Sequence, residues 1–110
     1  MLNKISVMLI CILFGYSCKN VSPLCEDTEF TYNNDVKTIV DASCNTIGCH
    51  IQNATIGDFT TYEEMSKIFD NGKFKNHVFT LGDMPKGNIL NFEDKAILQC
   101  WMENGFLEKL

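Results

Sequence analysis

The sequence predicts an all-α protein, and two observations support this prediction. Three segments place apolar residues at the three- and four-residue spacing of a helix, and each begins at a residue that favours a helix N-terminus. No segment shows the convincing alternation of apolar and polar residues that is typical of a half-buried strand. Of the 110 residues, the part that follows residue 17 is long enough for one small domain.

Residues 1–17 are typical of an export signal. Lys4 precedes an apolar run over residues 5–14, which is too short to cross a membrane and suits the core of a signal peptide. Small residues then lead to Cys18, as in bacterial lipoprotein signals, where the cysteine becomes the first mature residue and carries the lipid. Because Tyr16 departs from the usual small-residue box, cleavage by an ordinary signal peptidase is the alternative. We expect an exported protein, on the periplasmic or cell-surface side, with a lipid anchor in a bacterial membrane.

The exported chain divides into a short polar tether, residues 18–33, and a helical domain, residues 34–110. The first helix is expected to begin near Asn34 and Asp35 and to run into the motif that starts at residue 44. Its apolar face consists of Val36, Ile39, Val40 and Cys44.

The second helix is marked by a capping box, with Thr61 as the cap and Glu64 three residues further on. Gly72 is a natural stop for this helix. Its apolar stripe consists of Tyr62, Met65, Ile68 and Phe69.

The third helix is expected to begin at Asn91 and to end at Gly105, with acidic residues in its first turn. This layout leaves residues 73–90 as a long connection. The inward face of the third helix consists of Ala96, Ile97, Cys100 and Trp101.

Residues 44–50, C-N-T-I-G-C-H, carry the strongest chemical signal. Two thiols followed at once by an imidazole can tether a haem through its vinyl groups and ligate its iron, as in the C-x-x-C-H attachment signature. Here four residues separate Cys44 from Cys49, and the second cysteine adjoins His50. The alternative interpretation is a short-loop disulfide between Cys44 and Cys49, with His50 an ordinary surface histidine.

A second axial ligand for such an iron is offered by residues 83–87, D-M-P-K-G, in the long connection. The thioether of Met84 is a soft ligand, and a His/Met pair raises the reduction potential relative to two histidines. His77, the only other histidine, is the alternative distal ligand or a plain loop residue, and Met84 is then a packing residue. Candidate walls of the pocket, or simply core residues, are Phe59, Phe69, Phe74, Phe79 and Trp101.

The cysteines suit an exported protein, because disulfides form and persist outside the cytosol. One of the six cysteines lies in the signal. If Cys18 takes a lipid and the motif cysteines take a haem, Cys25 and Cys100 remain to pair as a disulfide. Alternatively, the same four cysteines form two disulfides and the protein binds no haem. Both arrangements use all four, so the number of cysteines does not decide between them.

The charge balance excludes some partners. All nine basic residues are lysine, against fourteen acids, and the net charge is −5. This balance argues against nucleic acid and suits a transient partner with a basic docking face. With only two histidines, no Ser/His/Asp set for hydrolysis is evident.

Five stretches together resemble the small lipoprotein cytochromes c of Bacteroidetes-type bacteria: Y-N-N-D-V-K at 32–37, S-C to C-H at 43–50, G-D-F-T-T-Y at 57–62, M-P at 84–85 and C-W at 100–101. The resemblance covers about residues 30 to 105. It implies a class I cytochrome c-like domain of about three helices that carries one haem c. Cys44 and Cys49 would form the thioethers, with His50 as proximal ligand and Met84 as distal ligand. The spacing of the cysteines and the order Met-Pro depart from the commonest cytochromes.

The function implied by the resemblance is the transfer of single electrons to a transient redox partner protein, without enzymatic catalysis. Two alternatives belong to other classes. One is a haem-free lipoprotein, stapled by disulfides, that serves as a binding or structural module. The other is a haem domain that senses or binds a small gas at an open distal site.

Overall fold

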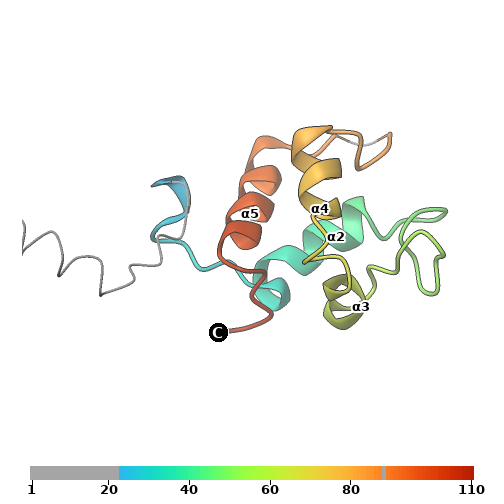
Figure 1. The fold of residues 1–110 in the computed structure, drawn as a ribbon, viewed down its shortest axis with the longest axis horizontal. Coiled ribbons are helices and arrows are strands. Elements are labelled where there is room, and N and C mark those ends of the chain that lie inside the picture. The colour runs from blue at the N-terminus through green and yellow to red at the C-terminus, as the bar shows by residue number, and fades with distance from the viewer. Residues whose placement is uncertain (1–22, 88) are drawn as a thin grey trace, which may run out of the picture.

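The computed structural model describes residues 23–87 and 89–110, and every regular element in these ranges is helical (Figure 1). The predicted all-α class is therefore confirmed for the described residues. The predicted export signal and Cys18 lie outside them. No helix among the described residues has the length and apolar character needed to cross a membrane. In chain order the elements are η1 (Pro23–Cys25), η2 (Tyr32–Val36), α2 (Lys37–Ser43), α3 (Tyr62–Ser66), α4 (Lys73–Lys75), η3 (Asn76–Thr80) and α5 (Phe92–Glu103).

The first predicted helix is formed by η2 and α2, which follow one another without a break. It begins earlier than predicted, because Thr31 acts as its cap. The Thr31 hydroxyl accepts a hydrogen bond from the backbone N–H of Asn34 (3.3 Å), and the Asp35 carboxylate accepts one from the N–H of Thr31 (2.8 Å). These reciprocal bonds satisfy N–H groups that no helical carbonyl can reach. Three of the four predicted apolar positions, Val36, Ile39 and Val40, are buried. The fourth, Cys44, follows the end of α2 and is partly buried against the core.

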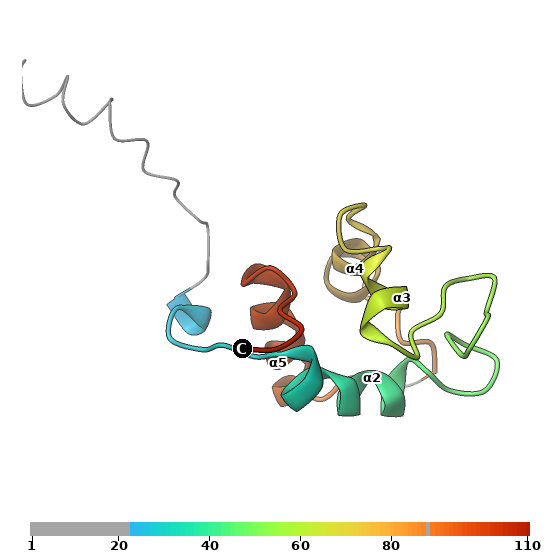
Figure 2. The same cartoon turned by 90° about the horizontal axis from the view of Figure 1, so that it is seen from below.

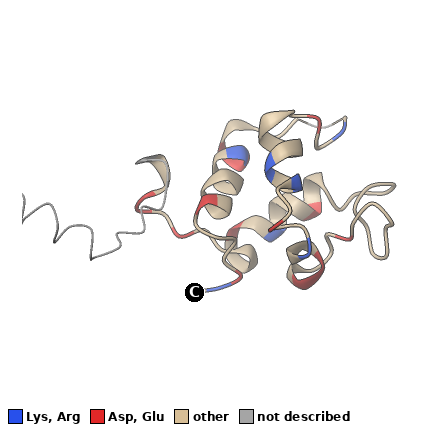
Figure 3. Ribbon diagram, viewed as in Figure 1, with Lys and Arg blue, Asp and Glu red and all other residues tan. Residues whose placement is uncertain are grey.

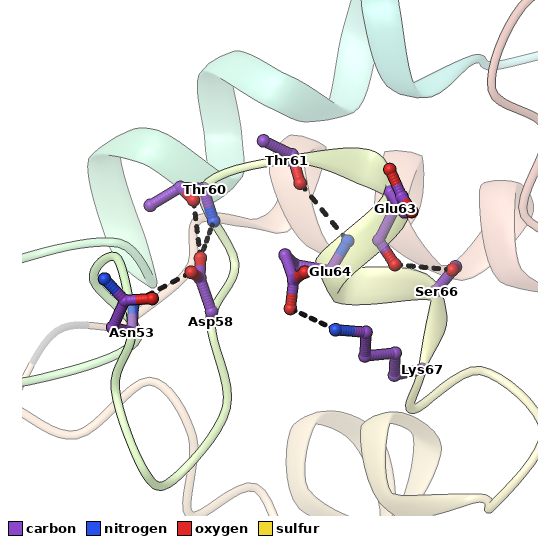
Figure 4. Close-up of polar contacts among 8 residues, drawn as sticks. All are labelled: Asn53, Asp58, Thr60, Thr61, Glu63, Glu64, Ser66 and Lys67. Carbon is purple, nitrogen blue, oxygen red and sulfur yellow. Dashed lines mark hydrogen bonds and ion pairs between the residues drawn. The ribbon is translucent and has the colours of Figure 1, made fainter.

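Helix α3 begins where the capping box predicts. The hydroxyl of Thr61 accepts a hydrogen bond from the backbone N–H of Glu64 at 3.2 Å (Figure 4). The helix ends at Ser66 instead of near Gly72, and residues 67–71 form turns. Met65 is fully buried, and the rest of the predicted stripe is partly buried against the core.

The prediction of about three helices was too low, because the connection over residues 73–90 contains a further helical segment. This segment consists of α4 and η3 and spans residues 73–80. Phe74 and Val78, four residues apart, are its buried side chains. Their helical spacing was the sequence signal for this element.

Helix α5 begins as predicted, because the side-chain oxygen of Asn91 accepts a hydrogen bond from the N–H of Asp94 at 2.7 Å. Its most buried residues are Leu98, Cys100 and Trp101. Leu98 was not among the predicted inward positions, whereas Ile97 is only partly buried.

The core is centred on Trp101, which is fully buried and donates its indole N–H to the carbonyl of Leu107 at 2.9 Å. The rings of Phe69, Phe74 and Phe106 surround the indole, with centroids 5.3, 6.1 and 5.0 Å from it. All three pack nearly perpendicular to it, an arrangement that the charge distribution of aromatic rings favours.

The two ends of the described chain are tied to each other. Cys25 and Cys100 form the predicted disulfide, with Cα atoms 5.1 Å apart and a sequence separation of 75. In the chain-entropy model a loop of this length gives about 4 kcal/mol of stability. Tyr32 N–H donates to the carbonyl of Leu107 at 2.8 Å, and Thr31 is completely buried. The later part of the predicted tether is therefore packed against the end of the chain.

The loop after α2 lies at the far side of the molecule from this tied end. Figures 1 and 2 both show residues 44–60, in green, extending from the end of α2 away from η1 and the C-terminus. This loop carries the C-x-x-x-x-C-H motif.

Candidate functional site

A cavity of about 490 Å³ lies between the loop after α2, the α4–η3 segment and the loop before α5. Its size falls in the range of roughly 300–1,000 Å³ that sites for small ligands and cofactors occupy. All the ligand positions predicted from the sequence line it: Cys44, Cys49, His50, His77 and Met84. The fold thus brings together residues that are up to 40 positions apart in the chain.

The two motif cysteines are unpaired thiols of intermediate burial. The disulfide between them, the alternative drawn from the sequence, is not formed. The loop is closed instead by a backbone bond, in which His50 N–H donates to the carbonyl of Cys44 (3.1 Å). Cys44 itself is fixed at the end of α2, where its N–H donates to the carbonyl of Val40 (2.8 Å). Burial raises the pKa of the Cys44 thiol to about 11, and the neighbouring Cys49 adds to this increase. Cys44 is therefore a neutral thiol at the cavity.

The ring of His50 is held by two contacts. Its Nδ1 lies 2.9 Å from the carbonyl oxygen of Gly57, and its face stacks on the ring of Phe59 with centroids 3.9 Å apart and planes within 5°. A carbonyl only accepts hydrogen bonds, so Nδ1 carries a proton, and in the neutral ring Nε2 is left with the lone pair. This is the state in which a histidine binds a metal, and the bond to Nδ1 fixes the ring orientation.

Gly57 is suited to this contact for two reasons. Its φ of +115° lies in the region that favours glycine. A Cβ at this position would lie 3.4 Å from both His50 Nδ1 and Phe59 Cε1. A larger residue would therefore strain the backbone and crowd both rings.

The outer part of the same loop is braced by Asp58 (Figure 4). Its carboxylate accepts hydrogen bonds from the hydroxyl and N–H of Thr60 and from the N–H of Asn53. The Thr60 hydroxyl, followed by the two backbone N–H groups, lowers the pKa of Asp58 below its ordinary value. In the sequence, Asp58 lies between Gly57 and Phe59, the two residues that hold the His50 ring.

Met84 reaches the cavity from the other side, on a loop that His77 ties down. The N–H of Met84 donates to the carbonyl of His77 at 3.2 Å. The His77 Nδ1 lies 2.9 Å from one carboxylate oxygen of Asp83 and 3.2 Å from the other. His77 thus contacts both residues of the Asp83–Met84 pair, and Met84 is partly buried against the core. The peptide bond between Met84 and Pro85 is cis.

The remaining walls are mostly apolar. Of the aromatic residues proposed as walls from the sequence, Phe59 and Phe74 line the cavity, whereas Phe69, Phe79 and Trp101 belong to the core beside it. No sequence pattern predicts that the carbonyl of Gly57 and the carboxylate of Asp83 hold the two histidines. Gly57 and Asp58 stand out in the sequence only through the resemblance.

The ligand-type side chains surround the cavity without meeting at one point. Among residues 23–87 and 89–110, no three His, Cys, Asp or Glu side chains form a cluster that could hold a bare metal ion. Comparison with protein-family models, with curated proteins and with solved structures finds no match to this chain.

Proposed function

We propose that this protein is a small c-type cytochrome that transfers single electrons through one covalently attached haem. The observation that supports this most directly is the lining of the 490 Å³ cavity, which combines two unpaired thiols, an imidazole with its Nδ1 already bonded and a thioether. Cys44 and Cys49 would form the thioether bonds to the haem, and His50 and Met84 would be its axial ligands.

The donor set fits this cofactor better than a bare metal ion. A haem brings four ring nitrogens to its iron, so the protein must supply only two axial ligands. Side chains that are spread around an apolar cavity suit that requirement, and the lack of a three-residue cluster among the described residues agrees with it. When bound, the haem supplies an iron that alternates between the ferrous and ferric states.

The chain's own residues would set the properties of that iron. The Gly57 carbonyl orients His50 and makes its Nε2 a better electron donor. The soft sulfur of Met84 favours the ferrous state and raises the potential. We assign Met84 in preference to His77 as the distal ligand, because the His77 side chain is 40% exposed and is bonded to Asp83 at the surface.

The remaining elements of the proposal concern the domain and its location. The helical fold with the motif directly after α2 supports a class I cytochrome c-like domain. The segment that precedes residue 18 supports export and a lipid anchor at Cys18, and a transient redox protein is then the expected partner.

The decisive experiment is the visible spectrum of protein expressed together with a cytochrome c maturation system. We expect Soret and α bands that stay with the protein when non-covalent haem is extracted with acidified acetone. The matched variant Cys44→Ala/Cys49→Ala should lose all covalent haem, whereas Cys25→Ala/Cys100→Ala should keep it. A colourless wild-type protein with two free thiols would favour the haem-free, disulfide-stapled module instead. Binding of carbon monoxide to the ferrous wild type would favour a gas-binding haem domain.

A further inference from the structure

Two lysines, Lys73 and Lys86, line the cavity. Among the residues that the structure describes, no aspartate or glutamate does. This reverses the balance of a chain with fourteen acids and a net charge of −5. Figure 3 shows lysines in blue on α4, which carries Lys73 and Lys75, and on the loop that leads toward α5.

Neither lysine has an acidic partner among the described residues. The lysine ion pairs of this part of the chain join Lys37 to Asp41 and Lys67 to Glu64, both away from the cavity. The acid closest in sequence to Lys86, Asp83, is bonded to His77. Two uncompensated ammonium groups beside an apolar cavity create a local positive potential, which favours a ligand with anionic groups.

We propose that Lys73 and Lys86 bind the carboxylates of the molecule in this cavity, which in the proposed cytochrome are the two haem propionates. This inference rests on the proposed function. It follows from the arrangement of the porphyrin, since the vinyl groups and the propionates occupy opposite edges of the ring. The vinyl edge belongs with the cysteines of the loop after α2. The two lysines come from other segments, Lys73 at the start of α4 and Lys86 just after Met84 and Pro85.

Lysine suits this role in a chain that has no arginine. Its ammonium is a compact charge on a flexible stem, so it can follow a propionate without a fixed bidentate geometry. The pairing also affects the iron. If the two ammonium groups are removed, the propionate charges are no longer offset, and they then stabilise the ferric state.

The test compares two double variants that remove the same charge. Lys73→Gln/Lys86→Gln removes the cavity lysines, and Lys75→Gln/Lys95→Gln removes two exposed lysines that do not line the cavity. Each holoprotein is titrated optically to obtain its midpoint potential. For the cavity variant we expect a decrease on the order of tenfold in the redox equilibrium constant, which is ~59 mV for one electron. The control variant should change much less.

Redox-difference infrared spectroscopy with haem labelled at the propionate carbons gives a second readout. The carboxylate bands should shift in Lys73→Gln/Lys86→Gln and return toward their wild-type positions in Lys73→Arg/Lys86→Arg. Unchanged bands in the cavity variant, or an equal change of potential in both double variants, would overturn the inference while leaving the cytochrome intact. If the wild type carries no haem, its spectrum shows this first, and both proposals fall. If the double variant does not attach haem, the same bands are measured in the single variants Lys73→Gln and Lys86→Gln. Each should shift the bands in the same direction as expected for the double variant, by a smaller amount.

Discussion

His50 Nδ1 lies 2.9 Å from the carbonyl oxygen of Gly57, and this single bond decides which nitrogen of the neutral ring carries the proton. The bond depends on a backbone conformation that favours glycine, with φ at +115°. It joins the end of the cysteine motif to the segment that carries Phe59, so the ring is fixed from its edge and from its face.

Gly57→Ala should therefore disturb both stability and ligation. The left-handed conformation costs a residue with a Cβ about 1–3 kcal/mol, and the new Cβ would crowd the His50 ring at 3.4 Å. We expect a lower midpoint in denaturant unfolding and, in the proposed cytochrome, an altered electron paramagnetic resonance spectrum of the ferric haem.

Gly105→Ala is the matched control for this change. Gly105 also has a positive φ, +92°, but a Cβ there meets nothing within 4 Å. It should lower stability without changing the haem spectrum. If the two variants give the same ferric spectrum, the Gly57 carbonyl does not set the orientation of His50.

If the proposed haem is bound with Met84 as its distal ligand, Met84→Ala should open one face of the iron. The ferrous variant is expected to bind carbon monoxide and to have a lower reduction potential, because water or no ligand replaces a soft sulfur that favours the ferrous state. Carbon monoxide difference spectra and potentiometric titration measure both effects. In His77→Ala the iron should stay closed to carbon monoxide. The opposite result, with only the His77 variant open, would assign the distal position to His77.

Much of this fold was predictable because two of its helices begin at residues whose side chains cap the helix N-terminus. Thr61 and Asn91 each accept the hydrogen bond from the residue three positions on, as their sequence contexts indicate. The α4–η3 segment was missed because it lacks such a cap. It is preceded by Gly72 in a left-handed conformation. A glycine in this conformation is also typical of the end of a helix, so the sequence does not distinguish the two roles.

The candidate ligands were also predictable, since thiols, imidazoles and thioethers are few in this chain and fall into recognisable spacings. The contacts that hold these ligands in place were not predictable. The carbonyl of Gly57 is a backbone group that every residue possesses, and its role follows only from the path of the loop. Likewise, nothing in the sequence distinguishes Asp83 from the other acids among the fourteen, and its contact with His77 follows only from the fold.

Removal of the Cys25–Cys100 disulfide should cost stability without affecting the cavity in which we propose that haem binds. The double variant Cys25→Ala/Cys100→Ala is expected to lose about 2–5 kcal/mol, because the unfolded chain is no longer constrained and both positions are buried. Denaturant titration of the holoprotein measures this loss. The visible spectrum should be unchanged, since neither cysteine lines the cavity. A loss of haem absorption in folded protein would show that this bridge also shapes the site.

The brace at Asp58 predicts how the stability of the motif loop depends on pH. The hydrogen bonds from Thr60 and Asn53 lower the pKa of Asp58 in the folded protein below that of an unfolded aspartate, which is about 3.9. The ionised carboxylate therefore stabilises the folded state above about pH 4, and this contribution is lost as the pH falls through the lowered folded-state pKa. Asp58→Asn should unfold at a lower temperature than the wild type between pH 5 and 7, and the difference should shrink as the pH is taken below 4. Thermal melts of both proteins across this range measure the difference.

Asp70→Asn, which removes an exposed carboxylate from the turn after α3, is the control for general charge effects. An Asp58→Asn difference that is independent of pH, or one that the Asp70 variant reproduces, would show that the carboxylate does not brace the loop.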